Sequence, residues 1–250
     1  MKILGSDFDG TLAEGGITEE KCAAVARWRA AGHKFGIISG RGGDFLSHCR
    51  EAYPALPLDF YAACNGAYIT DGEGRVIAEA VCREVSAAEL LAALYDKSEV
   101  IYIKVAERCM RVVKEGESRA IPSDERTVPY EVAATLPYFH CFSACLRHPE
   151  EVGAVGAEMG VRYRDHLTPL PNGAWVDLVP RGINKAEGLR RVAAHFGADE
   201  GDVIAVGDNT NDVDMISAFR SYAMENGVAA VKAVADGIVR DVTEVIEREI

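Results

Sequence analysis

The sequence predicts an α/β fold in which a doubly wound parallel sheet is interrupted by an inserted α+β domain. Three observations lead to this fold class. Short, uniformly apolar strands alternate with helical segments at both ends of the chain, as in parallel sheets covered on both faces. Polar residues directly follow several of these strands. The middle of the chain, from about Val76, instead carries alternating strands typical of a half-exposed antiparallel sheet. We therefore expect a core at 1–80 and 181–250 and an insertion at 81–180.

Composition restricts the function classes. The chain has 250 residues, 48% of them hydrophobic, and a formal net charge of −12. This charge argues against a nucleic-acid or anionic-membrane partner, because affinity for polyanions comes from Lys and Arg. No apolar run has the length of a signal peptide or a membrane span. The seven cysteines are scattered without a framework spacing, which fits a reducing compartment, so we expect a cytoplasmic protein.

The first predicted strand, residues 2–5, is followed by two aspartates, Asp7 and Asp9, in the segment Ser-Asp-Phe-Asp-Gly-Thr. Ligands of open α/β sheets collect at such strand ends. If the strand continued, the two carboxylates would point the same way, and in a dry cleft they would repel unless a cation or a proton came between them. The alternative is a pair of turn or cap aspartates, and the partners found further along the chain decide between the two.

The next two core strands also end in polar turns. After a helix at 18–31 with Thr18 as N-cap, a strand at 35–38 ends in Ser39-Gly40-Arg41-Gly-Gly and is followed by a helix at 44–52. A hydroxyl and backbone N–H groups in such a turn suit an anion, although an ordinary capped turn would look the same. The third strand, 60–64, ends at Asn65, which belongs either to the same edge or to a plain turn.

The insertion is expected to contain two helices and several strands. The helices are placed at 87–94 and 150–159, and the strands at 100–105, 109–113, 138–146, 161–164 and 175–179. One stretch of it, His140, Cys141, Cys145 and His148, carries residue types that bind zinc. On a strand, residues 141 and 145 face one side and residues 140 and 148 the other, so we do not expect the four to converge on one ion.

The parallel pattern resumes near residue 182. Lys185 follows a predicted Asn184 N-cap and opens a helix at 186–196, closed by Gly197. The helix dipole disfavours a cation at that position. Lys185 is therefore either a solvated surface lysine or an ammonium that extends into the strand-end cleft to hold a phosphoryl oxygen.

A strand at 202–206 precedes a second acidic pair, Asp208 and Asp212, with Asn211 between them. An aspartate after a strand is often only a helix cap. Oxygen ligands of this kind are also the type that Mg²⁺ prefers, commonly together with substrate phosphate. Two further strand–helix units, 222–224 with 228–235 and 237–239 with 243–249, complete the core. The strand ends together meet the needs of phosphoryl transfer: a nucleophile, a proton donor, a cation and a metal.

In order and spacing these segments resemble the four motifs of the haloacid dehalogenase (HAD) superfamily. The segments are Asp7-Phe8-Asp9-Gly10-Thr11, Ile38-Ser39-Gly40-Arg41, Lys185 and Gly207-Asp208-Asn209-Thr210-Asn211-Asp212. The turn at Asn65, the long insertion between the second and third motifs, and the segment 223–227 resemble the Cof-type branch. The resemblance implies a Rossmann-like core with an inserted cap of the C2B kind.

The resemblance also implies roles for three catalytic residues. Asp7 would attack phosphorus and become an aspartyl-phosphate, with its other oxygen on Mg²⁺. Asp9 would protonate the leaving alcohol and then activate the hydrolytic water, and its backbone carbonyl would also bind the metal. Lys185 would hold Asp7 and the phosphoryl group.

Five further residues receive binding roles from the resemblance. Ser39 and the neighbouring amide of Gly40 would bind the phosphate, and Asn211 would contact it or fix the acids. Asp208 would ligate Mg²⁺, and Asp212 would ligate it directly or orient its waters.

The function expected from these residues is a Mg²⁺-dependent phosphatase acting on a small phosphate monoester, a sugar phosphate or related metabolite. A phosphomutase with the same nucleophile is the first alternative. A catalytically idle binding protein is disfavoured, because it should have lost Asp7, Asp9 or Lys185, and this chain keeps all three. Dehalogenation is disfavoured too, because it needs neither the metal nor the leaving-group acid. We expect a small phosphorylated metabolite as the only partner, and a monomer or small homo-oligomer. Candidate substrate readers in the cap are Arg108, Arg111, Arg147, Arg162, Arg164 and His166.

Overall fold

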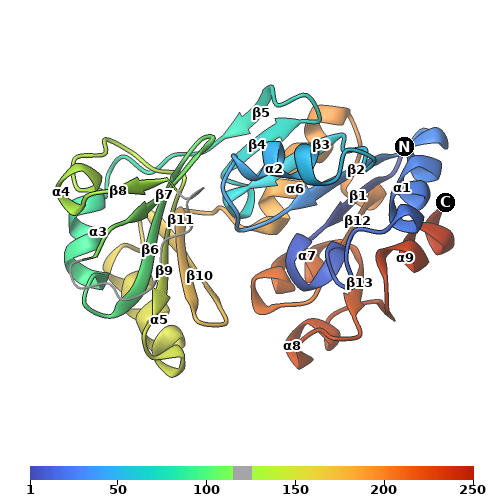
Figure 1. The fold of residues 1–250 in the computed structure, drawn as a ribbon. Coiled ribbons are helices and arrows are strands. Elements are labelled where there is room, and N and C mark those ends of the chain that lie inside the picture. The colour runs from blue at the N-terminus through green and yellow to red at the C-terminus, as the bar shows by residue number, and fades with distance from the viewer. Residues whose placement is uncertain (115–125) are drawn as a thin grey trace. The chain divides into compact units, whose positions relative to one another are not determined.

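The computed structural model, drawn in Figure 1, describes residues 1–114 and 126–250. The chain divides into two compact units. The first consists of Met1–Arg41, Phe45–Glu79 and Asn184–Ile250, and the second of Gly42–Asp44 and Ala80–Ile183. The second unit is thus inserted between two long segments of the first. No helix among the described residues combines the length and the apolar character that crossing a membrane requires.

The first unit is built on an eight-stranded sheet with the order β14-β13-β12-β1-β2-β3-β4-β5. The strands are β1 (Ile3–Ser6), β2 (Lys34–Ile38), β3 (Phe60–Ala63), β4 (Tyr68–Asp71), β5 (Val76–Glu79), β12 (Val203–Gly207), β13 (Arg220–Met224) and β14 (Gly237–Val239). The run from β14 to β3 is parallel, and β4 and β5 are antiparallel. The predicted doubly wound parallel core is confirmed.

Helices cover this sheet on both faces. They are α1 (Glu19–Ala30), α2 (Phe45–Ala52), α6 (Lys185–Phe196), α7 (Val213–Ala218), α8 (Ala229–Lys232) and α9 (Val242–Glu249). Helix α1 packs against α9, and α6 packs against α7. Ile3 of β1 shares an apolar cluster with Leu189 of α6 and Met215 of α7. Helix α8 is a single turn, shorter than the predicted helix at 228–235.

The second unit contains a six-stranded sheet with the order β10-β11-β9-β6-β7-β8. The strands are β6 (Ser98–Val105), β7 (Arg108–Val112), β8 (Thr127–Val128), β9 (Cys141–Leu146), β10 (Leu167–Asn172) and β11 (Trp175–Pro180), and the helices are α3 (Ala87–Leu94), α4 (Tyr130–Ala133) and α5 (Val152–Arg162). All strand pairs are antiparallel except β7 with β8. Helix α3 packs on β9, and α5 packs on β10 and β11 (Figure 1). The α+β insertion predicted from the sequence is confirmed.

Two details of the sequence prediction were wrong. A strand was expected at 161–164, but α5 continues to Arg162 and the strand begins at Leu167. The helical register explains this, because the buried residues Val155 and Met159 are followed four positions later by the buried Tyr163. The alternating pattern from Val76 does not begin the second sheet either, since β5 pairs with β4 in the first.

The four zinc-type residues of the second unit are not assembled into a metal site. Within the described ranges, no group of three or more metal-ligating side chains includes His140, Cys141, Cys145 or His148. The Nδ1 of His140 instead accepts a hydrogen bond from the backbone N–H of Ala106, at 3.0 Å.

Candidate active site

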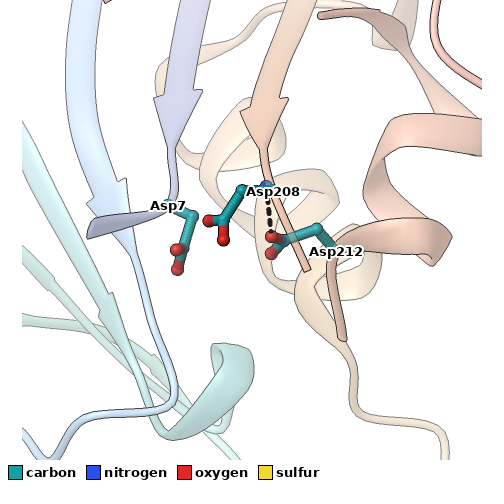
Figure 2. Close-up of side chains that lie close together, drawn as sticks. All are labelled: Asp7, Asp208 and Asp212. Atoms are coloured by element: carbon teal, nitrogen blue, oxygen red, sulfur yellow. Dashed lines mark hydrogen bonds between the residues drawn. The ribbon is translucent and has the colours of Figure 1, made fainter. Parts of the chain in front are cut away.

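The candidate site lies where two adjacent parallel strands end. Asp7 follows β1, and its backbone N–H donates to the carbonyl of Val206 at 2.9 Å. Asp208 follows β12, whose Val206 is in register with Ser6 of β1. The two aspartates therefore emerge at the same edge of the sheet, as Figure 2 shows.

Asp212 completes a group of three carboxylates. One oxygen from each of Asp7, Asp208 and Asp212 lies within 4.8 Å of the others. A turn positions Asp212, because its Oδ2 accepts from the backbone N–H groups of Asp208 and Asn209, each at 2.9 Å. The first of these bonds is the dashed line in Figure 2. Segments about 200 residues apart in the sequence thus meet in one acidic cluster.

Lys185 places a positive charge beside this cluster. Its Nζ lies 2.6 Å from Oδ1 of Asp7 and 2.5 Å from Oδ1 of Asp212, and its side chain is 1% exposed. The first turn of α6 packs closely on the turn at Gly66. This approach requires glycine, because a Cβ on Gly66 would lie only 2.7 Å from the Cα of Gly188. Lys185 is thus a buried cation and not a solvated surface lysine.

The turn after Asp7 closes over Asp208. Thr11 donates its hydroxyl to Oδ1 of Asp208 at 2.6 Å. Gly10 has a φ of +76°, and a Cβ at this position would lie 2.5 Å from Oδ2 of Asp208. Asn226 donates to the carbonyl of Gly10 at 2.9 Å. The Gly-Thr turn therefore needs its glycine for both conformation and space.

Burial and mutual repulsion perturb the acids. Burial raises the pKa of Asp7 well above its ordinary value, Lys185 opposes this shift, and Asp212 adds to it. Burial also raises the pKa of Asp208, with Thr11 opposing and Asp212 adding. The pKa of Lys185 is raised despite burial, because Asp212 and Asp7 stabilise its ammonium. With all four groups ionised, three carboxylates and one ammonium leave a formal charge of −2.

The chemistry of this donor set fits a divalent cation. Carboxylate oxygens are hard ligands of the kind Mg²⁺ takes, and a charge of +2 would balance the cluster. Asp7 and Asp208 could bind it. The Asp212 carboxylate already accepts from Lys185 and from two backbone N–H groups, so it is suited to orienting the others.

Asp9 lies apart from the three-carboxylate group. Strand β1 ends at Ser6, so the two-residue alternation that would align Asp7 with Asp9 does not extend this far. Its side chain is 57% exposed and forms an ion pair with Arg41. The structure therefore separates the two aspartates that the sequence presents as a pair.

The turn after β2 lies at the same edge. Ser39 is buried, its Oγ accepts from the N–H of Arg41 at 3.2 Å, and its carbonyl accepts from the N–H of Asn65 at 2.8 Å. Gly40 lies between Ser39 and Arg41 in this turn. Asn211 donates its side-chain amide to Oδ1 of Asn65 at 3.4 Å, so the turn after β3 joins the turn after β12.

Sequence reasoning did not foresee two contacts of this site. Thr11 and Asn226 belong to segments that carried the resemblance, but no role was assigned to either. The only sequence feature that pointed to Thr11 and Asn226 is that each follows a strand in a glycine-containing turn. Of the six proposed substrate readers in the second unit, Arg111 is buried and the other five are exposed.

The sequence and the fold both match known proteins. A family model described as haloacid dehalogenase-like hydrolase matches residues 4–246. The chain is 25% identical to pyridoxal phosphate phosphatase YbhA of Escherichia coli K12, covering 97% of this chain and 94% of that protein. It is 24% identical to 5-amino-6-(5-phospho-D-ribitylamino)uracil phosphatase YbjI of the same organism, covering 94% and 89%. The HAD subclass IIB sugar phosphatase BT4131 shares the fold, with a TM-score of 0.80 and 23% identity over 99% of this chain and 98% of that chain.

Proposed function

The chain belongs to the haloacid dehalogenase-like hydrolase family and is a phosphoric monoester hydrolase, and on this premise we propose that it uses Mg²⁺ and an aspartyl-phosphate on Asp7. The observation that carries the proposal is the buried group of Asp7, Asp208 and Asp212 around Lys185. Its charge of −2 would destabilise the fold unless a cation offsets it. A nucleophile, a cation and a metal position at one strand edge are what phosphoryl transfer requires.

In the first step, a carboxylate oxygen of Asp7 attacks phosphorus and the bond from phosphorus to the alkoxy oxygen breaks. Asp9 gives its proton to the departing oxygen, so the leaving group departs as a neutral alcohol. The ammonium of Lys185, hydrogen-bonded to Asp7, stabilises the negative charge that gathers on the phosphoryl oxygens. The products of this step are the alcohol and Asp7 as an acyl phosphate.

In the second step, water attacks the phosphorus of the acyl phosphate and Asp9 accepts a proton from it. The bond between phosphorus and Asp7 breaks, which releases inorganic phosphate and restores the Asp7 carboxylate. Ser39 and the amide of Gly40 would hold the phosphoryl oxygens during both steps, and Asn211 would contact phosphate or fix the acids.

Asp7 and Asp208 would bind the metal with the backbone carbonyl of Asp9, and Asp212 would ligate it or orient its waters. When bound, Mg²⁺ supplies Lewis acidity and reduces the repulsion between the attacking carboxylate and the phosphate dianion. The hydrogen bond from Thr11 would hold Asp208 in its ligating orientation.

The proposed substrate is a small phosphorylated metabolite. Two relatives are named for pyridoxal phosphate and for a phosphoribityl-aminouracil, and a structural neighbour is named a sugar phosphatase. These leaving groups differ widely, while phosphate monoester hydrolysis is common to them. We therefore assign the reaction to the first unit and the choice among phosphate esters to the second, inserted unit.

The test is phosphate release from a panel of sugar phosphates, pyridoxal phosphate and nucleoside monophosphates, with Mg²⁺ or with a chelator. Wild type is compared with Asp7→Asn, and Asp199→Asn makes the same chemical change at an exposed position. We expect Mg²⁺-dependent release that Asp7→Asn abolishes and Asp199→Asn retains. Isomerised sugar phosphate without free phosphate would instead indicate a mutase. Full activity of Asp7→Asn would rule out the acyl phosphate.

A further inference from the structure

The side chain of Asp9, the residue proposed to move the leaving-group proton, is bound by Arg41. The Nε of Arg41 lies 2.7 Å from its Oδ2, and the Nη2 of Arg41 lies 2.6 Å from its Oδ1. This is the two-pronged geometry in which a guanidinium engages both oxygens of a carboxylate. The carboxylate is therefore turned toward Arg41, and it does not belong to the group of Asp7, Asp208 and Asp212.

Arg41 is the fixed member of this pair. Its guanidinium carbon lies 4.3 Å from the ring centre of Phe45 and 5.5 Å from that of Phe8. The two rings pack edge to face at 4.7 Å. The backbone of Arg41 is also tied down, because its N–H donates to Ser39 and its carbonyl accepts from Cys64 at 2.8 Å. A guanidinium that rests on two aromatic rings loses little freedom by staying in place.

Asp9 is the member that can move. Its side chain is 57% exposed, and it sits in the turn between Asp7 and Gly10 and not on a strand. An exposed ion pair contributes little to the stability of the orientation that it holds. Losing such a pair therefore changes the ratio of two side-chain orientations by about fivefold or less. The two-pronged contact between Arg41 and Asp9, called the fork below, is thus strong enough to set the resting orientation of Asp9. It is weak enough for a bound substrate to open.

We propose that Arg41 holds the Asp9 carboxylate in a parked orientation, from which the side chain must turn before it can, as a carboxylic acid, give a proton to the leaving oxygen. Arg41 is then a positioning residue of the reaction, and this inference rests on the proposed function. Parking affects the step in which the bond to the alkoxy oxygen breaks and that oxygen takes the proton of Asp9. It affects that step only for leaving groups that need the proton.

The experiment compares kcat/KM for two substrates in wild type and Arg41→Gln. This parameter covers the steps up to departure of the leaving group. The first substrate is an alkyl phosphate that the panel shows to be turned over, and the second is 4-nitrophenyl phosphate, whose phenolate departs unprotonated. We expect Arg41→Gln to raise kcat/KM for the alkyl phosphate by up to about fivefold. The value for 4-nitrophenyl phosphate should stay unchanged.

The chain offers a matched control in the pair Arg29 and Asp59. The Nε and Nη2 of Arg29 lie 2.7 and 3.1 Å from the two oxygens of Asp59, so the fork is the same but lies in another part of the first unit. Arg29→Gln should leave the ratio of the two kcat/KM values unchanged. Arg41→Lys keeps the charge without the fork and should change the ratio less than Arg41→Gln. If Arg41→Gln does not fold, Arg41→Lys takes its place in the comparison of the two substrates.

Three results would overturn the proposal. An equal fall for both substrates would mean that Arg41 contacts the substrate, and unchanged kcat/KM values for both substrates would mean that it does not restrain Asp9. The third readout needs no activity: a crystal structure of Arg41→Gln should show the Asp9 carboxylate in a new orientation, and an unchanged orientation would exclude parking. If wild type hydrolyses neither substrate, the proposed function fails, and the crystal structure alone decides the role of Arg41.

Discussion

Each of the two units buries a lysine beside aspartate, and the two lysines are surrounded differently. In the first unit, Lys185 contacts Asp7 and Asp212, with Asp208 as a further member of the acidic group. In the second unit, Lys104 lies 2.6 Å from the hydroxyl of Ser143 and 3.9 Å from Asp177. Both lysine side chains are less than a tenth exposed.

In the second cluster, a hydroxyl links the lysine to one aspartate. Ser143 accepts from Lys104 and donates to Asp177 at 2.5 Å, so among the described residues one acid and one base share a hydroxyl. The neighbouring Cys141 is held as a thiol, because burial, with the charge of Asp177 adding, raises its pKa to about 12. The Lys185 cluster has acids in excess. A buried cluster with matched charges needs nothing from solution, whereas one with unmatched charge attracts an ion or a substrate.

The sharpest test of this comparison replaces each lysine with methionine. Lys185→Met should lose phosphatase kcat/KM by about 10³-fold, because the cation that stabilises the phosphoryl charge is gone. Lys104→Met should retain most of the phosphatase kcat/KM. For both variants, this parameter is measured as phosphate release from 4-nitrophenyl phosphate. Both should lose stability in urea denaturation, by about 3–5 kcal/mol if each aspartate stays charged and unpaired. Equal losses of activity would mean that the two clusters share a role.

Metal binding gives the next largest effect. Mg²⁺ at about 100 times its Kd should stabilise wild type by about 2.7 kcal/mol in thermal unfolding, since only the folded chain assembles the three carboxylates. Asp208→Asn should reduce this stabilisation strongly. Asp177→Asn, the same change in the other cluster, should preserve it. A Mg²⁺ response that survives Asp208→Asn would place the ion elsewhere.

The third effect is a pH dependence in chelator. Because the pKa of Asp7 is raised above its ordinary value of 3.8, the folded chain binds this proton more tightly than the unfolded chain. The contribution of Asp7 to the unfolding free energy therefore falls as pH rises from 3.8 to the raised pKa, by about 1.4 kcal/mol for each pH unit between these two values.

Asp7→Asn carries no such charge and should be more stable than wild type at pH 7 without metal. The difference should shrink as pH is lowered toward 4, and denaturant titrations from pH 4 to 8 measure it. A gap between the two proteins that stays constant over this range would show that Asp7 does not titrate as its burial requires.

Much of the core could be predicted because its signals are local. Thr18 accepts from the N–H of Lys21 and begins α1, as its position before two glutamates indicated. Asn184 accepts from the N–H of Glu187, and Gly197 ends α6 with a φ of +69°. Strand ends could be located from short apolar runs, and parallel strands bring those ends to one edge.

Other features have no local signal. Residues 161–164 alternate like a strand, yet α5 continues to Arg162, and of the four residues only Tyr163 is buried. The antiparallel strands β4 and β5 carry no mark that assigns them to the first sheet. The ion pair of Asp9 with Arg41 joins residues 32 positions apart in the chain.

The sequence by itself determined which residue types stand at the strand ends and that their order matches a phosphoryl-transfer site. Tertiary structure decided which of them share one environment. Asp7 and Lys185 are 178 positions apart and meet in a buried pair, whereas the near neighbours Asp7 and Asp9 differ in environment, with the side chain of Asp7 buried and that of Asp9 exposed. Residue order reports backbone geometry over a few positions, but burial and charge pairing depend on what the fold packs around each side chain.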